Sequence, residues 1–201
     1  MVLTQNGKLM KTSRKRGLRI ASFDLPPGIT CPNALQCKAG CYGKQGWYVR
    51  PCVQKRLREN HELSLSGEFC LVVGKAITTG KYDVVRIHST GDFYSEQYLS
   101  KWLRLWLALP DVQFYAYTKM VSMFKLRFTP SNFTVVYSYG GTEDHLINPS
   151  ADKHSVVFRD MASLKSAGYV YTNEDDLLCW SDRKIGLVYH GQRHFNKTGW
   201  I

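Results

Sequence analysis

Short runs of β-branched and aromatic residues recur along the chain and alternate with longer stretches of helical periodicity. The first run covers residues 18–23, and Pro26, Pro27 and Gly28 end it. Runs of this composition predict strands, and apolar residues on both of their faces are typical of buried parallel strands. We expect further strands over residues 83–88, 112–117, 133–137, 155–158, 169–171 and 185–189.

Helical periodicity separates several of these strands, over residues 52–66, 67–78, 95–109 and 121–126. The clearest helix begins after Ser95, a good N-cap residue, and ends before Pro110. Its apolar residues fall at spacings of three and four, which places them on one face that packs against a core. These residues are Tyr98, Trp102, Leu105, Trp106 and Leu109.

Alternation of strands and helices predicts an α/β fold with a mostly parallel sheet. Roughly six or seven strand–helix units fit into 201 residues, whereas a complete eight-fold barrel needs about 250 residues. The length therefore favours an incomplete (β/α) barrel, with a flat doubly wound sheet as the alternative. Both architectures bind ligands at the carboxyl ends of their strands.

The chain has the composition of one globular domain, with no internal repeat and no linker. We expect a basic N-terminal arm over about residues 1–17 and a short C-terminal tail over about 191–201. No apolar run is long enough to span a bilayer, and residues 1–17 lack the apolar stretch of a secretory signal. We therefore expect an intracellular protein, in which its six cysteines stay reduced and bind metal or lie buried.

Basic residues outnumber acidic ones by 27 to 16, which gives a formal net charge of +11. A potential of this sign attracts nucleic acid, an acidic protein or an anionic surface. The alternative is a generally basic protein whose charges are only solvated. We expect a macromolecular partner, a nucleic acid or an acidic protein, and no membrane.

Three cysteines, Cys31, Cys37 and Cys41, lie in one short loop with five and then three residues between them. Soft thiolates select zinc or iron–sulfur clusters. Structural zinc sites usually carry a CxxC pair, which this loop lacks, so the spacing favours an iron–sulfur cluster. Three unrelated buried cysteines are the alternative interpretation.

Cys179 is the predicted fourth ligand, because it follows a polar loop between strands whereas Cys52 and Cys70 lie on predicted helices. Three thiolates would leave one iron open to a substrate or cofactor. A fourth thiolate would close the cluster and favour a structural or electron-transfer role.

Polar residues at two strand ends are candidates for catalysis. His88 and Asp92 lie at the end of one predicted strand, and Lys119 follows the next. His88 would donate to a cluster sulfur or carry a proton, and Asp92 would accept hydrogen bonds from a ligand. The alternative is that residues 89–92 form a turn that caps the next helix.

Several segments resemble the phage "gene product eighty-eight" family over about residues 4–190. They are the cysteine segment with Thr30-Cys31-Pro32 and Cys37-x-x-x-Cys41-Tyr42, the segment Arg86-Ile-His-Ser-Thr-Gly-Asp-Phe93, and the pair Cys179-Trp180. The resemblance implies a bacteriophage protein made in the host cytoplasm. It also implies a partial barrel similar to radical S-adenosylmethionine enzymes, with a [4Fe-4S] cluster. The cysteine spacing departs from the CxxxCxxC that those enzymes usually carry.

Three functions follow from these observations. The preferred one is an iron–sulfur protein whose cluster is structural or redox-active and which binds or acts on a host macromolecule. The second is a radical S-adenosylmethionine-type or other redox enzyme with an open cluster iron. The third is a zinc-stapled nucleic-acid-binding protein.

Overall fold

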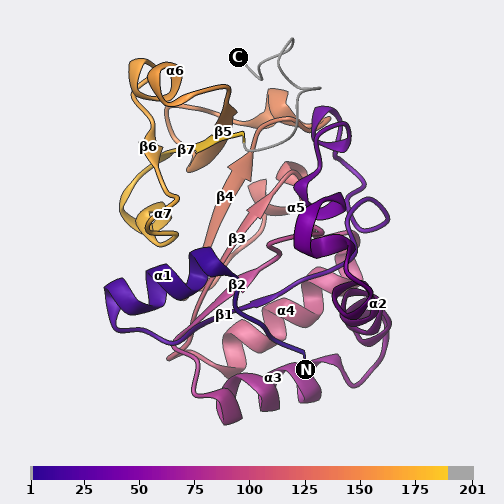
Figure 1. The fold of residues 1–201 in the computed structure, drawn as a ribbon. Coiled ribbons are helices and arrows are strands. Elements are labelled where there is room, and N and C mark those ends of the chain that lie inside the picture. The colour runs from indigo at the N-terminus through magenta and orange to yellow at the C-terminus, as the bar shows by residue number, and fades with distance from the viewer. Residues whose placement is uncertain (1, 190–201) are drawn as a thin grey trace.

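One parallel sheet is the centre of the fold, which a computed structural model describes for residues 2–189. Seven strands form a sheet that curls into a half-barrel (Figure 1). The strands are β1 (Ile20–Phe23), β2 (Val84–Ile87), β3 (Gln113–Thr118), β4 (Phe133–Ser138), β5 (His154–Phe158), β6 (Val170–Tyr171) and β7 (Lys184–Val188). Every described pair of neighbouring strands is parallel.

The strand order is β1-β2-β3-β4-β5-β7-β6. The first five strands follow chain order, as in a barrel, whereas a doubly wound sheet reverses its order at a switch point. The predicted incomplete barrel is therefore confirmed. The last two strands depart from chain order: β6 forms the edge of the sheet, and β7 lies between β5 and β6.

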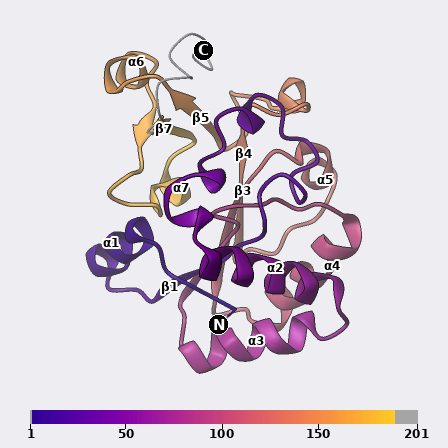
Figure 2. The same ribbon diagram turned by 45° about the vertical axis from the view of Figure 1, so that its right-hand side comes forward.

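Helices connect most of the strands and cover the two faces of the sheet differently (Figures 1 and 2). They are α1 (Gly7–Arg16), α2 (Pro51–Leu65), α3 (Phe69–Gly80), α4 (Glu96–Ala108), α5 (Val121–Lys125), α6 (Met161–Ser166) and α7 (Leu178–Ser181). We call the face covered by α3 and α4 the outer face, and the opposite face, against which α1 packs, the inner face.

Alternation along the strands divides the buried side chains between these faces. The outer face carries Phe23, Ile87 and Phe114, which pack with the aromatic residues Trp102 and Phe69 of α4 and α3. The inner face carries a smaller apolar cluster in which Leu9 of α1 joins residues of five strands and Cys179 of α7. These inner-face residues are Ile20, Val84, Tyr115, Val136 and Ile185.

Residues 7–16 of the expected basic N-terminal arm form helix α1. The Asn6 side chain caps this helix by accepting from Leu9 N, and Gly17 ends it in the left-handed region with a φ of 67°. Leu9 and Thr12 are fully buried against the sheet. A basic run can therefore be a packed helix when its few non-charged residues share one face.

The remaining predicted elements lie within a few residues of those observed, and α6 and α7 are additional short helices. The predicted C-terminal tail, residues 191–201, lies outside the described residues. Among the helices of residues 2–189, none has the length and apolarity needed to cross a membrane.

Candidate functional site

The cysteine loop, residues 26–50, runs along the carboxyl ends of the strands between β1 and α2 (Figure 2). The start of the loop is fastened to the end of β2. Leu25 N donates to Thr90 O at 3.0 Å, and Thr90 Oγ1 donates to Leu25 O at 2.9 Å. Gly91 has a φ of 87°, and a Cβ at this position would lie 2.5 Å from the Leu25 Cβ. The close approach therefore requires a glycine at 91.

The middle of the cysteine loop is fastened to the segment that follows β4. Leu35 N donates to Gly140 O at 3.2 Å, and Thr142 N donates to Asn33 O at 2.9 Å. A Cβ at Gly141 would lie 2.9 Å from Asn33 O, so a side chain there would force the two segments apart. These contacts confirm that the cysteine loop lies at the carboxyl end of the sheet.

The three loop thiols are half-buried and interact with one another. The Cys41 thiol donates to Cys37, and this hydrogen bond lowers the pKa of Cys37 to about 6, with Lys119 and Lys44 assisting. The same hydrogen bond raises the pKa of Cys41, since the donor must keep its proton. Burial raises the pKa of Cys31 to about 11. Without a metal the loop therefore favours one thiolate among three thiols.

Asp92 and Lys119, two predicted site residues, lie beside these thiols and are held by the backbone. The Asp92 carboxylate accepts from Phe93 N at 2.8 Å and from Lys119 N at 2.9 Å. Lys119 Nζ donates to Ser138 Oγ at 2.8 Å and to Tyr139 O at 2.9 Å. Burial raises the pKa of Asp92, although its hydrogen bonds oppose the change. Both residues thus fix the strand ends below the cysteine loop.

His88, another predicted site residue, turns toward the outer face. Its φ is 67°, its Nε2 lies 2.9 Å from the Tyr98 hydroxyl, and its ring contacts Phe93 edge-on. Burial lowers the pKa of His88 to about 3, and the charge of Arg86 adds to the effect. The imidazole is therefore neutral near neutral pH and packs with the α4 aromatics.

Cys179 lies on the inner face, where a buried polar cluster surrounds it. Burial raises its pKa to about 12, the carboxylate of Asp176 adds to the effect, and the Tyr117 hydroxyl opposes it. The described interactions of Cys179 are with this inner-face cluster, whereas those of the loop thiols are with one another, Asp92, Lys44 and Lys119.

Asp176 is the centre of the inner-face cluster. Its Oδ1 lies 2.6 Å from Lys8 Nζ, and its Oδ2 accepts from Arg86 Nη1 at 2.8 Å and from the Tyr115 hydroxyl at 2.6 Å. The Arg86 guanidinium lies 5.1 Å from the ring centre of Tyr117. Arg86 Nε is buried without a hydrogen-bond partner in the described part of the chain, and the Tyr117 hydroxyl interacts with the Cys179 thiol.

The family model of gene product 88 matches residues 1–198, which is nearly the whole chain. The chain belongs to the gene product 88 family. Two relatives are the "Gene 88 protein" of Mycobacterium phage L5 and the "Gene 88 protein" of Mycobacterium phage D29. Each is 34% identical over a segment that covers 49% of this chain and 47% of the relative. The chain thus spans about half the length of the curated relatives it matches, and no solved structure matches it.

The gene product 88 fold brings Cys31, Cys37, Cys41, Asp92 and Lys119 to one edge of the sheet. As they stand, no three or more His, Cys, Asp or Glu side chains within residues 2–189 form a group that holds a metal ion. Chemically, the edge offers one thiolate, two further thiols and two lysines. Such a set can bind a soft metal once the thiols are deprotonated.

Sequence reasoning missed the inner-face cluster of this gene product 88 chain. Two signals point to it: Arg86 interrupts an otherwise apolar strand, and an acidic triplet occupies positions 174–176. A charged residue in a buried strand needs a counter-charge. The pairing of Arg86 with Asp176 was missed, because the basic run at residues 8–16 was interpreted as a solvated arm and not as a helix that packs beside them.

Proposed function

We propose that this chain is a phage-encoded iron–sulfur protein, made in the host cytoplasm, whose Cys31, Cys37 and Cys41 hold a [4Fe-4S] cluster. The observation that carries the proposal is the mutual interaction of the three thiols in one anchored loop, with the pKa of Cys37 lowered to about 6. A thiolate is the form that binds metal. Because the pKa of Cys37 is lowered to about 6, this thiol loses its proton near neutral pH.

The surroundings of the three thiols fit such a cluster. Lys44 and Lys119 bring positive charge to Cys37, which offsets the negative charge that cluster thiolates accumulate. A cluster contains several metal atoms, so its thiolates need not converge on one point as they do around a zinc ion. The three thiols themselves are half-buried.

Three thiolates leave one cluster position without a cysteine ligand. Cys179 packs on the inner face with Tyr117 and Asp176, so we assign the cluster to the three loop cysteines. When bound, the cluster would supply stability to the loop and a site for one-electron transfer. Lys119 and Asp92 would hold the strand ends in place beneath it.

Anaerobic purification followed by iron and acid-labile sulfide analysis tests the proposal. We expect the parent protein to show iron, sulfide and the visible absorbance of iron–sulfide bonds. We expect most of the iron and sulfide to be lost in each of three variants, Cys31→Ala, Cys37→Ala and Cys41→Ala. The exposed Cys52→Ala is the matched control and should keep them. Iron contents that are unchanged in all three loop variants would contradict the proposal.

Cys179→Ala separates a three-thiolate site from the four-thiolate site that the sequence favours. We expect this variant to retain the iron and sulfide of the parent protein. Loss of iron in Cys179→Ala, with the protein still folded by circular dichroism, would restore Cys179 as the fourth ligand. Zinc in place of iron would favour the zinc-stapled alternative.

A redox enzyme with an open cluster iron is the second candidate, and an unpartnered polar atom of the inner face, Arg86 Nε, favours it. Arg86 Nε, buried without a hydrogen-bond partner among residues 2–189, would offer a donor to a polar substrate. Electron paramagnetic resonance of the reduced protein, with and without S-adenosylmethionine, distinguishes the candidates. An altered signal with cleavage of the cofactor would favour the enzyme, and an unaltered signal would favour the structural or electron-transfer role.

A further inference from the structure

The net positive charge of the protein comes entirely from its first 58 residues. Residues 1–58 contain 12 of the 27 Lys and Arg residues but one of the 16 Asp and Glu residues. Residues 59–201 therefore contain fifteen of each and are formally neutral. The one acidic residue of the first part, Asp24, is buried, and its burial raises its pKa.

The basic residues of α1 are largely matched within the fold. Lys8 pairs with Asp176, Lys11 lies 3.0 Å from Glu174, and Arg16 Nη2 lies 2.8 Å from Asp175. The acidic triplet at 174–176 thus offsets much of the charge of this helix. Within residues 2–189, most of the basic side chains of this first part that form no ion pair lie in the cysteine loop and α2.

Five exposed basic residues occupy this second part, from the cysteine loop to the middle of α2. They are Lys38, Lys44, Arg50, Lys55 and Arg58. No acidic residue occurs between Asp24 and Glu59. Within residues 2–189, the one ion pair recorded for these five joins Lys55 to Glu59 at 3.8 Å, one helical turn away.

Exposed aromatic rings accompany these charges. Trp47 is 70% exposed and Tyr42 is 56% exposed. The Arg50 guanidinium lies 3.4 Å from the ring centre of Trp47, and Tyr42 contacts Tyr48 edge-on. Exposed aromatics among lysines and arginines supply both phosphate contacts and stacking platforms for bases.

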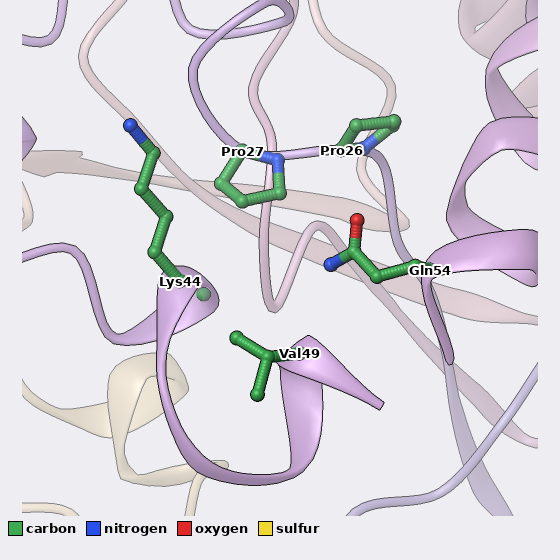
Figure 3. Close-up of a pocket in the computed structure, with 6 residues that line it drawn as sticks. Pro26, Pro27, Lys44, Val49 and Gln54 are labelled. Carbon is green, nitrogen blue, oxygen red and sulfur yellow. The ribbon is translucent and has the colours of Figure 1, made fainter. Parts of the chain in front are cut away.

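An open pocket adjoins these residues, and Figure 3 shows the side chains that line it. Pro26, Pro27 and Val49 give it apolar walls, and Lys44 and Gln54 give it polar groups. Its volume is about 310 Å³, at the lower end of the range for small-molecule sites. Gln54 Nε2 donates to Tyr48 O at 2.6 Å, which fixes its carboxamide at the pocket wall.

We propose that the cysteine loop and the start of α2 form a binding surface for single-stranded nucleic acid. Lys38, Lys44 and Arg50 would contact phosphates, Trp47 would stack on one base, and the pocket would receive another. An acidic protein would use the charges but has no need of an exposed tryptophan beside an open pocket. The surface is built from side chains other than the cysteines, so this inference does not rest on the proposed cluster.

Fluorescence anisotropy with a labelled oligothymidine tests the charges, using the full chain purified anaerobically. The triple variant Lys38→Gln, Lys44→Gln, Arg50→Gln is compared with Lys75→Gln, Arg104→Gln, Lys165→Gln, which removes the same charge from exposed positions on α3, α4 and α6. We expect at least a tenfold loss of affinity in the first triple variant and less than about twofold in the second. The slope of log K against log salt should fall by about 2 in the first, since each phosphate contact on a single strand contributes about 0.7.

Trp47→Ala tests the stacking platform and should weaken binding roughly tenfold, whereas Trp47→Phe should restore most of the affinity. Iron content is measured on every sample, so loss of the cluster and loss of binding are seen separately. Absence of binding at low salt, or equal losses in the two triple variants, would overturn the inference. Equal affinity for a duplex or for polyglutamate of the same length would also overturn it.

Discussion

Asp176 connects three elements through one carboxylate. It contacts Lys8 of α1, Arg86 of β2 and Tyr115 of β3, and its own amide donates to Thr12 Oγ1 at 2.9 Å. Burial alone would raise the pKa of Asp176, but the charges of Arg86 and Lys8 outweigh it and lower the pKa to about 2. The carboxylate is therefore charged over the whole physiological range.

Asp176→Asn should destabilise the protein by roughly 3 kcal/mol, because it leaves Arg86 and Lys8 buried without their counter-charge. Glu174→Gln is the matched control two residues away. Glu174 also binds a lysine of α1, but both side chains are more than half exposed, so its loss should change stability by less than about 1 kcal/mol. Urea unfolding measures both values, and equal losses would contradict the role assigned to Asp176.

His88 gives stability a pH dependence whose sign follows from its pKa. The pKa is about 3 in the folded protein against a model-compound value of 6.5, so the unfolded chain binds a proton first. The contribution of His88 to the free energy of unfolding is complete above pH 6.5 and decreases as the pH falls toward 3. His88→Asn keeps a residue that tolerates the positive φ and removes this titration.

We expect the free energy of unfolding to fall less steeply in His88→Asn than in the parent protein between pH 6.5 and pH 4. Urea unfolding at several pH values measures the two slopes, and the carboxylates shared by both proteins cancel in the comparison. Parallel slopes would show that His88 is accessible to protons in the folded state.

At the residue scale, the sequence predicted the loop cysteines, Asp92 and Lys119 correctly as neighbours. Their proximity follows from topology alone, because carboxyl ends of parallel strands meet at one edge. His88 and Cys179 show why the rest was not predictable. Side-chain direction at a strand end depends on one backbone torsion, and a positive φ turned His88 away from the cysteine loop.

At the scale of elements, α1 is the largest departure from the sequence prediction. Its charged composition concealed two local signals, the Asn6 cap and the terminal Gly17. The helix is held by Leu9 on the inner face and by the ion pairs to residues 174–176. Helices α2 to α4 were predictable because their own apolar periodicity is long and regular.

Leu9→Ala should lower the free energy of unfolding by about 2–5 kcal/mol, since it opens a cavity beside Ile20 and Val84. Its neighbour Met10 is 41% exposed, so Met10→Ala should change stability by less than about 0.5 kcal/mol. Urea unfolding measures the free energy of unfolding of both variants, provided that its dependence on urea concentration keeps the same slope as in the parent protein. Equal small effects would mean that α1 is a solvated arm, as the composition suggests.

The exchange of β6 and β7 is the part of the sheet that sequence could not predict. Strand β6 has two residues, so it carries no pattern that selects its neighbour. The order is set by long-range packing, in which Gly186 of β7 leaves room for Leu164 of α6. A Cβ at Gly186 would lie 2.5 Å from that side chain.

At the scale of the whole molecule, a rigid sheet supports a loop of low secondary-structure content. Strands β2, β3 and β4 pair on both sides and lie between packed layers. The cysteine loop contains three short 3₁₀ turns and is fastened by a few backbone hydrogen bonds. Native-state hydrogen exchange should therefore be slowest in β2–β4 and fast in residues 32–50.

Binding of the proposed cluster should change exchange in the loop alone. Metal bound by the folded state adds its binding free energy to the stability of the segment that holds it. We expect amides of residues 32–50 to exchange more slowly in iron-loaded protein than in metal-free protein, with β2–β4 unchanged. Cys37→Ala treated with the same iron and sulfide is the control and should show no slowing. Metal binding slows exchange in the segment that holds the metal. Slower exchange confined to the strands would therefore place the metal elsewhere and exclude the loop as its site.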